Sequence, residues 1–233
     1  SYTFDARQKL LKTEEGFSRE NWASFAELGW LALPFTEESG GFGGTAVETM
    51  IMMEEFGKGL VVEPYVSTVI MAGSVIEAGG TTEHREGVLT EIMAGTKLAY
   101  LAYVEPQARF NLADITTTAK VAGDGYVING FKGVVLGGPS ADVLVVPART
   151  SGDQKDESGI TMFLVDASSA GISKRDYPTI DGMQASEIDL DNVSVPASAV
   201  LGEVGNGFGL LELGINNGIL AVGAEAVGAM EVL

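Results

Sequence analysis

Histidine and cysteine, which are common as catalytic bases, nucleophiles and zinc ligands, are almost absent from this sequence. There is no cysteine and only one histidine, His84, so a thiolate nucleophile and a thiolate metal site are excluded. Residues 82–86 around His84 are Thr, Glu and Arg, which is typical of a solvated helix face, and no second ligand follows at helical spacing. We interpret His84 as a surface residue rather than the base of a triad.

Carboxylates are the other candidates for acid–base chemistry. One group of them comprises Asp181, Glu187, Asp189 and Asp191. Ile188 and Leu190 alternate with the last three, which is the pattern of a strand with one wet face. We therefore expect these carboxylates at the surface. The sequence predicts no catalytic constellation and no metal site.

Two glycine-rich loops could bind an anion through their main-chain N–H groups. The first, 38–44, lacks the Lys-Ser/Thr of a P-loop and follows no strand, so neither the P-loop nor the dinucleotide fingerprint is met. The second, 205–209, directly precedes an apolar helical pattern. We interpret the first as a turn between helices and the second as a helix start without a ligand.

The amino-acid composition excludes some classes of partner. The 233 residues carry 32 acidic and 14 basic side chains, a net charge of −18, which argues against nucleic acid and against an anionic membrane surface as partners. No signal peptide and no apolar span of about 18 residues is apparent. Because the absence of cysteine fits a reducing compartment, we expect a cytoplasmic protein.

The elements that would position a site are helical over residues 1–95, which we expect to form an N-terminal helical domain. Thr45 with Glu48 forms a capping box, and Gly57 should end the helix that follows it. Apolar residues recur at helical spacing in the other segments. The predicted helices span 18–29, 45–57, 64–78 and 82–94.

Over residues 96–205 the apolar period changes from that of a helix to that of a strand. Asp124-Gly125 supplies the positive φ of a tight hairpin turn. We expect a middle β-barrel or sandwich domain. Its predicted strands span 98–104, 116–121, 126–129, 143–146, 160–165, 172–175 and 187–190.

Residues 206–233 return to the helical period and are rich in Ala and Gly, so this helix should pack closely against another. We expect it to be the first helix of a truncated C-terminal helical domain that continues beyond Leu233 or is completed by a partner. The predicted fold is therefore multi-domain α and β, with helices, then strands, then the start of a helical bundle.

Seven short strings, in order, resemble the acyl-CoA dehydrogenase family. They correspond to its "G-x-P-E-x-x-G-G" turn, its "T-E-P" motif, its "W-V-I-N-G-x-K" hairpin, its "G-I-x-x-F-L-V" strand and its "G-x-R-A-S", "V-x-V-P" and "L-G-E" strings. In this sequence they lie at 31–41, 105–106, 124–132, 159–165, 182–186, 193–196 and 201–203.

The resemblance implies FAD-dependent α,β-dehydrogenation of an acyl-CoA thioester, with the flavin between the barrel and the C-terminal bundle. It implies that flavin contacts come from the "T-E-P" segment and from the strand after the hairpin, mainly through main chain. The corresponding residues here are Ala102, Tyr103, Val104, Glu105, Pro106, Val134, Val135 and Leu136.

Three of these residues depart from the family pattern. Val104 replaces a hydroxyl that would reach the flavin, Val134 replaces an aromatic ring, and Leu136 replaces a second hydroxyl. Each lost hydrogen bond removes about 1 kcal/mol, and the lost ring about 0.5–1.5 kcal/mol. The flavin site should be weakened but not abolished.

The substrate contacts implied by the resemblance also differ. The residue expected near the CoA portion is Phe110 instead of Ser, and the "D-x-x-R" of the first C-terminal helix is Asn216 with Ile219. The catalytic carboxylate of family members would lie beyond Leu233.

These departures predict a small subunit that works with a homologous large subunit, although self-association into a dimer or tetramer is an alternative. Within the family, strings at 40–50, 63–65, 107–114 and 225–231 most resemble the small subunits of pimeloyl-CoA dehydrogenases. Other interpretations are a non-catalytic structural subunit without flavin, and a flavin oxidase or monooxygenase of the same fold, such as a nitroalkane oxidase.

Overall fold

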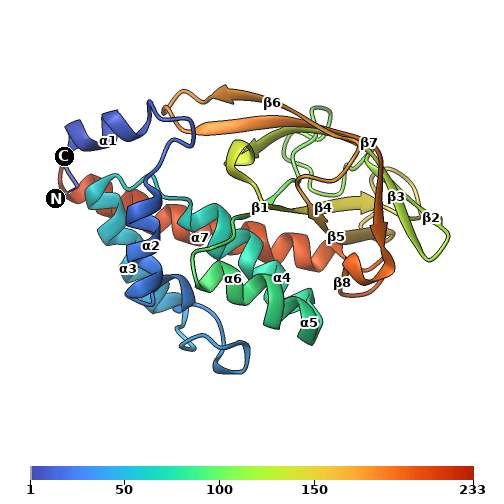
Figure 1. Cartoon of the computed structure of the whole chain (residues 1–233), viewed down its shortest axis with the longest axis horizontal. Coiled ribbons are helices and arrows are strands. Elements are labelled where there is room, and N and C mark those ends of the chain that lie inside the picture. The colour runs from blue at the N-terminus through green and yellow to red at the C-terminus, as the bar shows by residue number, and fades with distance from the viewer. Residues whose placement is uncertain (1) are drawn as a thin grey trace.

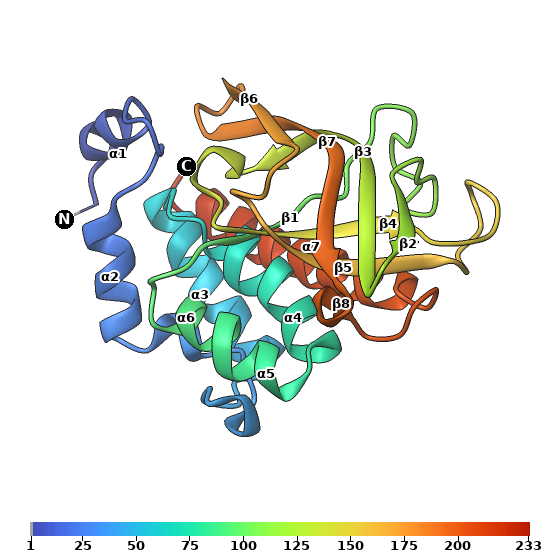
Figure 2. The same cartoon turned by 45° about the vertical axis from the view of Figure 1, so that its right-hand side comes forward.

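The structure, a computed structural model, describes residues 2–233. Helices gather on one side of the molecule and strands on the other, and the last helix, α7 (Phe208–Glu231), runs along both (Figures 1 and 2). One cluster of buried apolar side chains extends through both parts. The predicted order of helices, strands and a further helix is confirmed.

The helical part begins with capped helices, as predicted. Ser18 Oγ accepts from the N–H of Asn21 at the start of α2, and the capping box of Thr45 and Glu48 opens α3. The helices over 64–78 and 82–94 are present as two unbroken runs of short segments. The elements are α1 (Phe4–Leu10), α2 (Arg19–Glu27), η1 (Trp30–Ala32), η2 (Glu37–Ser39), α3 (Ala46–Gly59), η3 (Tyr65–Gly73), α4 (Ser74–Gly79), α5 (Thr82–His84), η4 (Arg85–Leu89) and α6 (Thr90–Met93).

The prediction that Gly57 ends its helix is wrong. α3 continues to Gly59, and Leu60 closes it in the left-handed conformation with φ of 49°. Gly57 instead lies where α3 crosses α7. A Cβ at Gly57 would overlap the carbonyl oxygen of Glu225, and a Cβ at Gly228 would overlap that of Glu54. The two glycines therefore let the helix backbones approach closely.

The strands form a sheet in the order β6-β7-β3-β2-β4-β5-β8, with β1 paired to β4 in parallel. The predicted hairpin of β2 and β3 is confirmed, but the positive φ of its turn comes from Gly123, at 62°, and not from Asp124-Gly125. β3 extends to Leu136, beyond the predicted end at residue 129, and pairs with β7. The bounds are β1 (Ala99–Leu101), β2 (Thr118–Ala122), β3 (Gly125–Leu136), β4 (Val143–Arg149), β5 (Ile160–Asp166), β6 (Ile172–Pro178), β7 (Gln184–Pro196), η5 (Gly138–Ser140), η6 (Ala197–Ala199) and β8 (Val200–Leu201).

The carboxylates of β7 lie on its wet face, as expected. Asp189 and Asp191 are exposed while Ile188 and Leu190 are buried. Glu187 accepts from Arg175 Nε at 2.8 Å on the neighbouring strand. This surface ion pair leaves no paired carboxylates for acid–base chemistry on β7.

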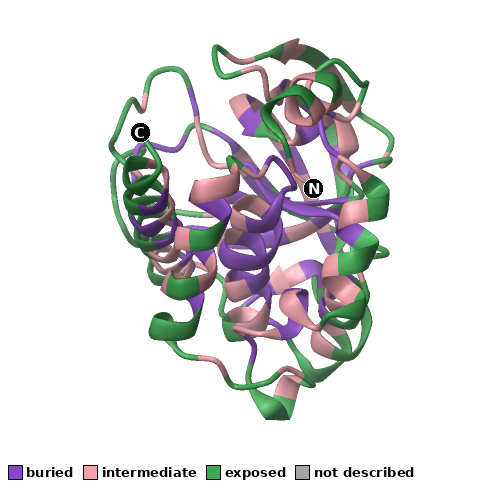
Figure 3. Cartoon of the chain, turned by 90° about the vertical axis from the view of Figure 1, so that its left-hand side faces the viewer, coloured by how far each residue is buried: buried purple, intermediate pink, exposed green. Residues whose placement is uncertain are grey.

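α7 corrects the expectation that the chain has no apolar span of membrane length. By length and composition, α7 is long and apolar enough to cross a membrane. Its buried positions pack against α3 and η3, while its outer side is exposed (Figure 3). The buried residues are all small except one: Leu211, Gly214, Gly218, Ala221, Ala224 and Gly228. Close helix packing within the fold accounts for these small residues, while large apolar side chains such as Ile219 and Met230 remain exposed.

Candidate active site

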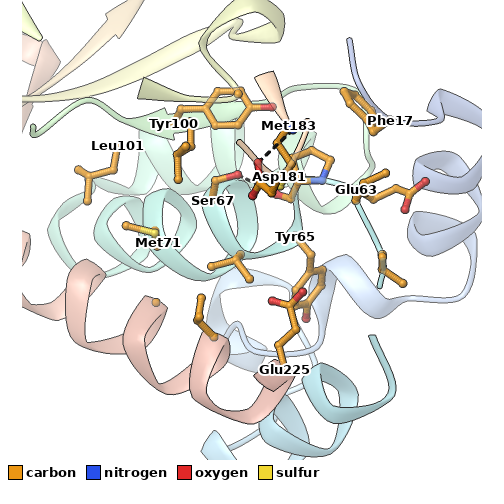
Figure 4. Close-up of a pocket in the computed structure, with 18 of the residues that line it drawn as sticks. Phe17, Glu63, Tyr65, Ser67, Met71, Tyr100, Leu101, Asp181, Met183 and Glu225 are labelled. Carbon is orange, nitrogen blue, oxygen red and sulfur yellow. Dashed lines mark hydrogen bonds between the residues drawn. The ribbon is translucent and has the colours of Figure 1, made fainter. Parts of the chain in front are cut away.

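A cavity of about 790 Å³ lies between the helices and the sheet. α7 and η3 form two of its walls, and residues at the ends of β1 and β3 form another. Tyr65, Ser67 and Met71 belong to η3, and Leu101 belongs to β1 (Figure 4). The lining is mainly apolar, so the space fits a small molecule with an extended apolar group.

The structure brings together the two segments for which flavin contacts are predicted. Val104 and Val134 form an antiparallel bridge, and the N–H of Gly133 donates to the carbonyl of Val104 at 2.8 Å. Tyr103, Val104, Val134 and Leu136 all line the cavity. These four side chains, three of them alkyl, therefore form one wall, which we call the valine wall.

The other predicted flavin residues do not line the cavity. Ala102 and Val135 are fully buried, and the N–H of Ala102 donates to Val145 of β4 at 2.9 Å. Pro106 is exposed on the far side of the segment. Their side chains support the valine wall from behind or lie outside it.

Glu105 has a structural role in this wall. Its Oε1 lies 2.8 Å from Lys132 Nζ, and both side chains are fully buried. Lys132 Nζ also donates to the carbonyl of Pro147 at 2.9 Å. Glu105 Oε2 accepts from the N–H of Thr116 at 2.8 Å, and Oε1 accepts from the N–H of Thr117 at 3.2 Å. A buried charge that is paired and hydrogen-bonded in this way is stable in its ionised form.

The pKa values follow from these contacts. Burial alone would raise the pKa of Glu105, but the charge of Lys132 and the hydrogen bonds from Lys132, Thr116 and Thr117 lower it to about 2. Burial lowers the pKa of Lys132, and Glu105 opposes that shift. Glu105 therefore stays a carboxylate and is not available as a proton-transfer group.

The predicted substrate residues lie outside the cavity lining. Phe110 is fully exposed in the loop before β2, and Asn216 is exposed on α7. Ile219, one turn after Asn216, does line the cavity. The structure thus places Ile219, rather than Asn216, on the cavity side of this helix.

His84 and the two glycine loops are occupied with local contacts. His84 Nδ1 accepts from the N–H of Thr81 at 3.2 Å and caps α5. The N–H groups of the first loop, at residues 41–44, donate to carbonyls of residues 32–36. In the second loop, Gly205 N donates to Thr161 Oγ1 at 2.8 Å and Gly207 N to the carbonyl of Ile160 at 2.7 Å. These donors are therefore not directed at an anion.

Sequence analysis considered one carboxylate of the cavity lining, Asp181, only as a surface residue, and it missed Glu63 and Glu225. Glu63 is buried and accepts from the hydroxyl of Tyr2 at 2.9 Å and from Asn21 Nδ2 at 2.8 Å, which ties the N-terminal segment to the start of η3. Glu225 lies on the cavity side of α7. Each appears in the sequence as a carboxylate within a largely apolar stretch, Glu63 just before a predicted helix and Glu225 within the last one.

FAD, which the resemblance implies, would meet the valine wall. Alkyl side chains can pack against a planar ring, but the side chains of Val104, Val134 and Leu136 offer it no hydroxyl or N–H donor, unlike that of Tyr103. The carbonyl of Val104 already accepts from Gly133. The three alkyl side chains would fit one apolar face of a flavin and would contribute packing there.

Two models of one family match the chain. The acyl-CoA dehydrogenase N-terminal domain matches residues 5–96, and the acyl-CoA dehydrogenase middle domain matches residues 101–193. This chain belongs to the acyl-CoA dehydrogenase family.

Individual relatives agree with this assignment. The chain is 31% identical over 224 residues to the acryloyl-CoA reductase (NADH) of Anaerotignum propionicum, which covers 94% of this chain and 57% of that protein. The acyl-CoA dehydrogenase from Geobacillus kaustophilus superposes with a TM-score of 0.88 at 28% identity, over 100% of this chain and 62% of that one. The Tcur3481-Tcur3483 steroid ACAD superposes with a TM-score of 0.87 at 29% identity, over 97% of this chain and 59% of that one. The chain thus spans about three fifths of these relatives.

Proposed function

We propose that this chain is the small subunit of an FAD-dependent acyl-CoA dehydrogenase that removes one hydrogen from each of the α- and β-carbons of an acyl-CoA thioester. The pairing of Val104 with Val134 beside the apolar cavity carries this proposal. It puts the two segments associated with the flavin in this family at the edge of a space that fits an acyl chain. Membership of the family supports the reaction type.

The residues of this chain would bind the acyl group and keep water from it. Apolar side chains of η3, β1 and α7 surround the cavity, and exclusion of water strengthens electrostatic interactions at the reacting atoms. When bound, FAD supplies the acceptor for the β-hydrogen, which leaves as hydride. A carboxylate takes the α-proton in the proposed reaction, and we assign this role to none of residues 2–233.

A homologous large subunit is the proposed partner. In the valine wall only Tyr103 carries a side-chain donor, its hydroxyl, so a partner chain would supply the other polar contacts. One similar structure carries two polypeptide names, Tcur3481 and Tcur3483. The absence of cysteine supports our proposal that the complex works in a reducing cytoplasm.

Co-expression of the protein that carries this chain with the product of a neighbouring homologous gene tests the proposal. We expect the pair to copurify, to retain FAD and to dehydrogenate an acyl-CoA in the presence of an artificial electron acceptor. A fully active, flavin-loaded homo-oligomer of this protein alone would contradict the pairing. A flavin-loaded pair inactive with all acyl-CoA chain lengths would contradict the reaction.

A non-catalytic structural subunit is the second candidate, and the alkyl character of Val104, Val134 and Leu136 favours it. The flavin content of the complex distinguishes the two. Val134→Asp would place a charge in the valine wall. Loss of flavin from the complex in this variant would support a direct contact between the wall and the flavin. Unchanged flavin content in that variant would favour the structural role.

A further inference from the structure

The charged side chains that the structure describes in the cavity lining are all acidic. The lining includes the carboxylates of Glu15, Glu63, Asp181 and Glu225, and among residues 2–233 it includes no Lys, Arg or His side chain. The first three carboxylates are engaged locally. Glu15 accepts from Arg19 Nε at 2.8 Å, Glu63 accepts from Tyr2 and Asn21, and Asp181 accepts from the N–H of Met183 at 3.1 Å.

Glu225 differs from these three. Within residues 2–233, no hydrogen bond to the Glu225 carboxylate contributes to its pKa. Burial raises this pKa, and the charge of Arg7 opposes the shift. Arg7 itself donates from Nε to the carbonyl of Leu60 and does not line the cavity. The side chain of Glu225 extends from α7 toward Tyr65 of η3 (Figure 4).

Glu225 marks one end of the cavity. α7 lines the cavity from Ile215 to Ala226, and the helix beside Ile215 packs near Leu101 of β1, since a Cβ at Gly214 would lie 3.4 Å from Leu101 Cδ2. Glu225 is ten residues further along, which is about 15 Å of helix. It therefore lies at the α3 end, away from β1.

We propose that the cavity takes an acyl chain with an uncharged, apolar terminus and rejects one that ends in a carboxylate, with Glu225 as the rejecting residue. This inference rests on the proposed function. A substrate carboxylate near Glu225 would be a like-charge pair in a partly desolvated space, which is unfavourable, and no cation in the described lining offsets it. Pimeloyl-CoA, the substrate in the name of the dehydrogenases that four strings of this sequence resemble, ends in a carboxylate. The lining of this cavity points instead to a monocarboxylic acyl group.

Heptanoyl-CoA and pimeloyl-CoA form a matched pair of probes, because both have seven-carbon acyl groups and only pimeloyl-CoA has a second carboxylate. Their Kd values would be measured by calorimetry on the complete flavin-loaded complex. We expect the native complex to bind heptanoyl-CoA at least about tenfold more tightly, the size of one charge interaction of about 1.4 kcal/mol. Glu225→Gln should remove most of this difference by tightening pimeloyl-CoA binding. Glu212→Gln, on the same helix but exposed and outside the lining, should leave it unchanged.

Equal or tighter binding of pimeloyl-CoA by the native complex would overturn the inference, as would a ratio unaffected by Glu225→Gln. If that variant does not fold, Val222→Lys provides the second test. Val222 lines the cavity one turn before Glu225 and is 51% exposed, so a lysine there should tighten pimeloyl-CoA binding selectively; no change would overturn the inference. Failure of both thioesters to bind would contradict the proposed function itself.

Discussion

Lys132 and Glu105 form a fully buried ion pair, with 2.8 Å between Nζ and Oε1. Glu105 follows Val104, and Lys132 lies on β3 just before Val134, so the pair fastens together the two segments of the valine wall. Glu105 also accepts hydrogen bonds from the N–H groups of Thr116 and Thr117. Lys132 Nζ also donates to the carbonyl of Pro147, which completes the network. We infer that the pair sets the position of the wall relative to the cavity.

Replacing Lys132 with Met should destabilise the protein strongly. The variant leaves Glu105 as a buried, uncompensated charge, a change that costs about 3–5 kcal/mol. The free energy of unfolding would be measured by urea denaturation. Lys120→Met, on the exposed part of β2, is the matched control and should change stability by less than about 0.5 kcal/mol. Equal effects of the two variants would contradict the role of the pair.

Glu105 should also make the protein sensitive to acid. Its pKa is lowered from 4.5 to about 2 in the folded state, so its carboxylate stabilises the fold above the unfolded pKa, and this contribution of about 3 kcal/mol is lost as pH falls from 4.5 toward 2. Urea denaturation across this range measures the loss. Glu105→Gln should be less stable at neutral pH and should show a shallower decline in acid; a parallel decline would show that other groups dominate.

The crossing of α3 and α7 should not tolerate a methyl group. Gly57→Ala or Gly228→Ala would push a Cβ into backbone of the facing helix, and such overpacking costs about 1–3 kcal/mol. Gly209→Ala is the control, because a Cβ there meets nothing within 4 Å, and it should be neutral or stabilising by up to about 1 kcal/mol. Thermal unfolding compares the variants. Tolerance at both Gly57 and Gly228 would be inconsistent with the close crossing.

Arg149 should hold two loops in place. Its guanidinium is largely buried and donates only to main-chain carbonyls, those of Ala113, Ile115, Ser151, Gln154, Asp156 and Ser158. Arg149→Met removes this donor from all six carbonyls, of which, within residues 2–233, only those of Ala113 and Gln154 keep the N–H of Ile115, and it should cost about 2 kcal/mol or more. Limited proteolysis should then cut within 151–158 faster than in the native protein.

Arg175→Met provides the comparison for Arg149. Arg175 also sits on a strand, but its side chain is 73% exposed and pairs with Glu187 at the surface. Surface pairs of this kind contribute about 0–1 kcal/mol. Faster cleavage within 151–158 in this variant as well would mean that Arg149 has no special role there.

The features that the sequence predicts correctly have local causes. The capping box of Thr45 and Glu48 and the hairpin turn at Gly123 are each determined within four residues, so their patterns can be recognised without knowing the fold. The prediction that Gly57 ends a helix is wrong because the requirement for glycine at this position comes from the backbone of α7, which is distant in sequence.

The site was harder to predict for the same reason. Glu105 and Lys132 are 27 residues apart, and nothing in either string shows that they pair. The family resemblance identifies the segments around Val104 and Val134, yet only the fold shows which of their side chains face the cavity. Glu225 could not be predicted as a specificity residue from the sequence, because the cavity that it lines forms only where α7, α3 and η3 meet.

The most direct test of the proposed dehydrogenase is anaerobic addition of heptanoyl-CoA to the purified, flavin-loaded complex while the visible absorbance of the flavin is recorded. We expect the flavin to be reduced, with the matching enoyl-CoA recovered in equal amount, and we expect Val104→Thr to retain flavin about fivefold more tightly through one added hydrogen bond of about 1 kcal/mol. A flavin that no acyl-CoA of any chain length reduces would contradict the proposed reaction.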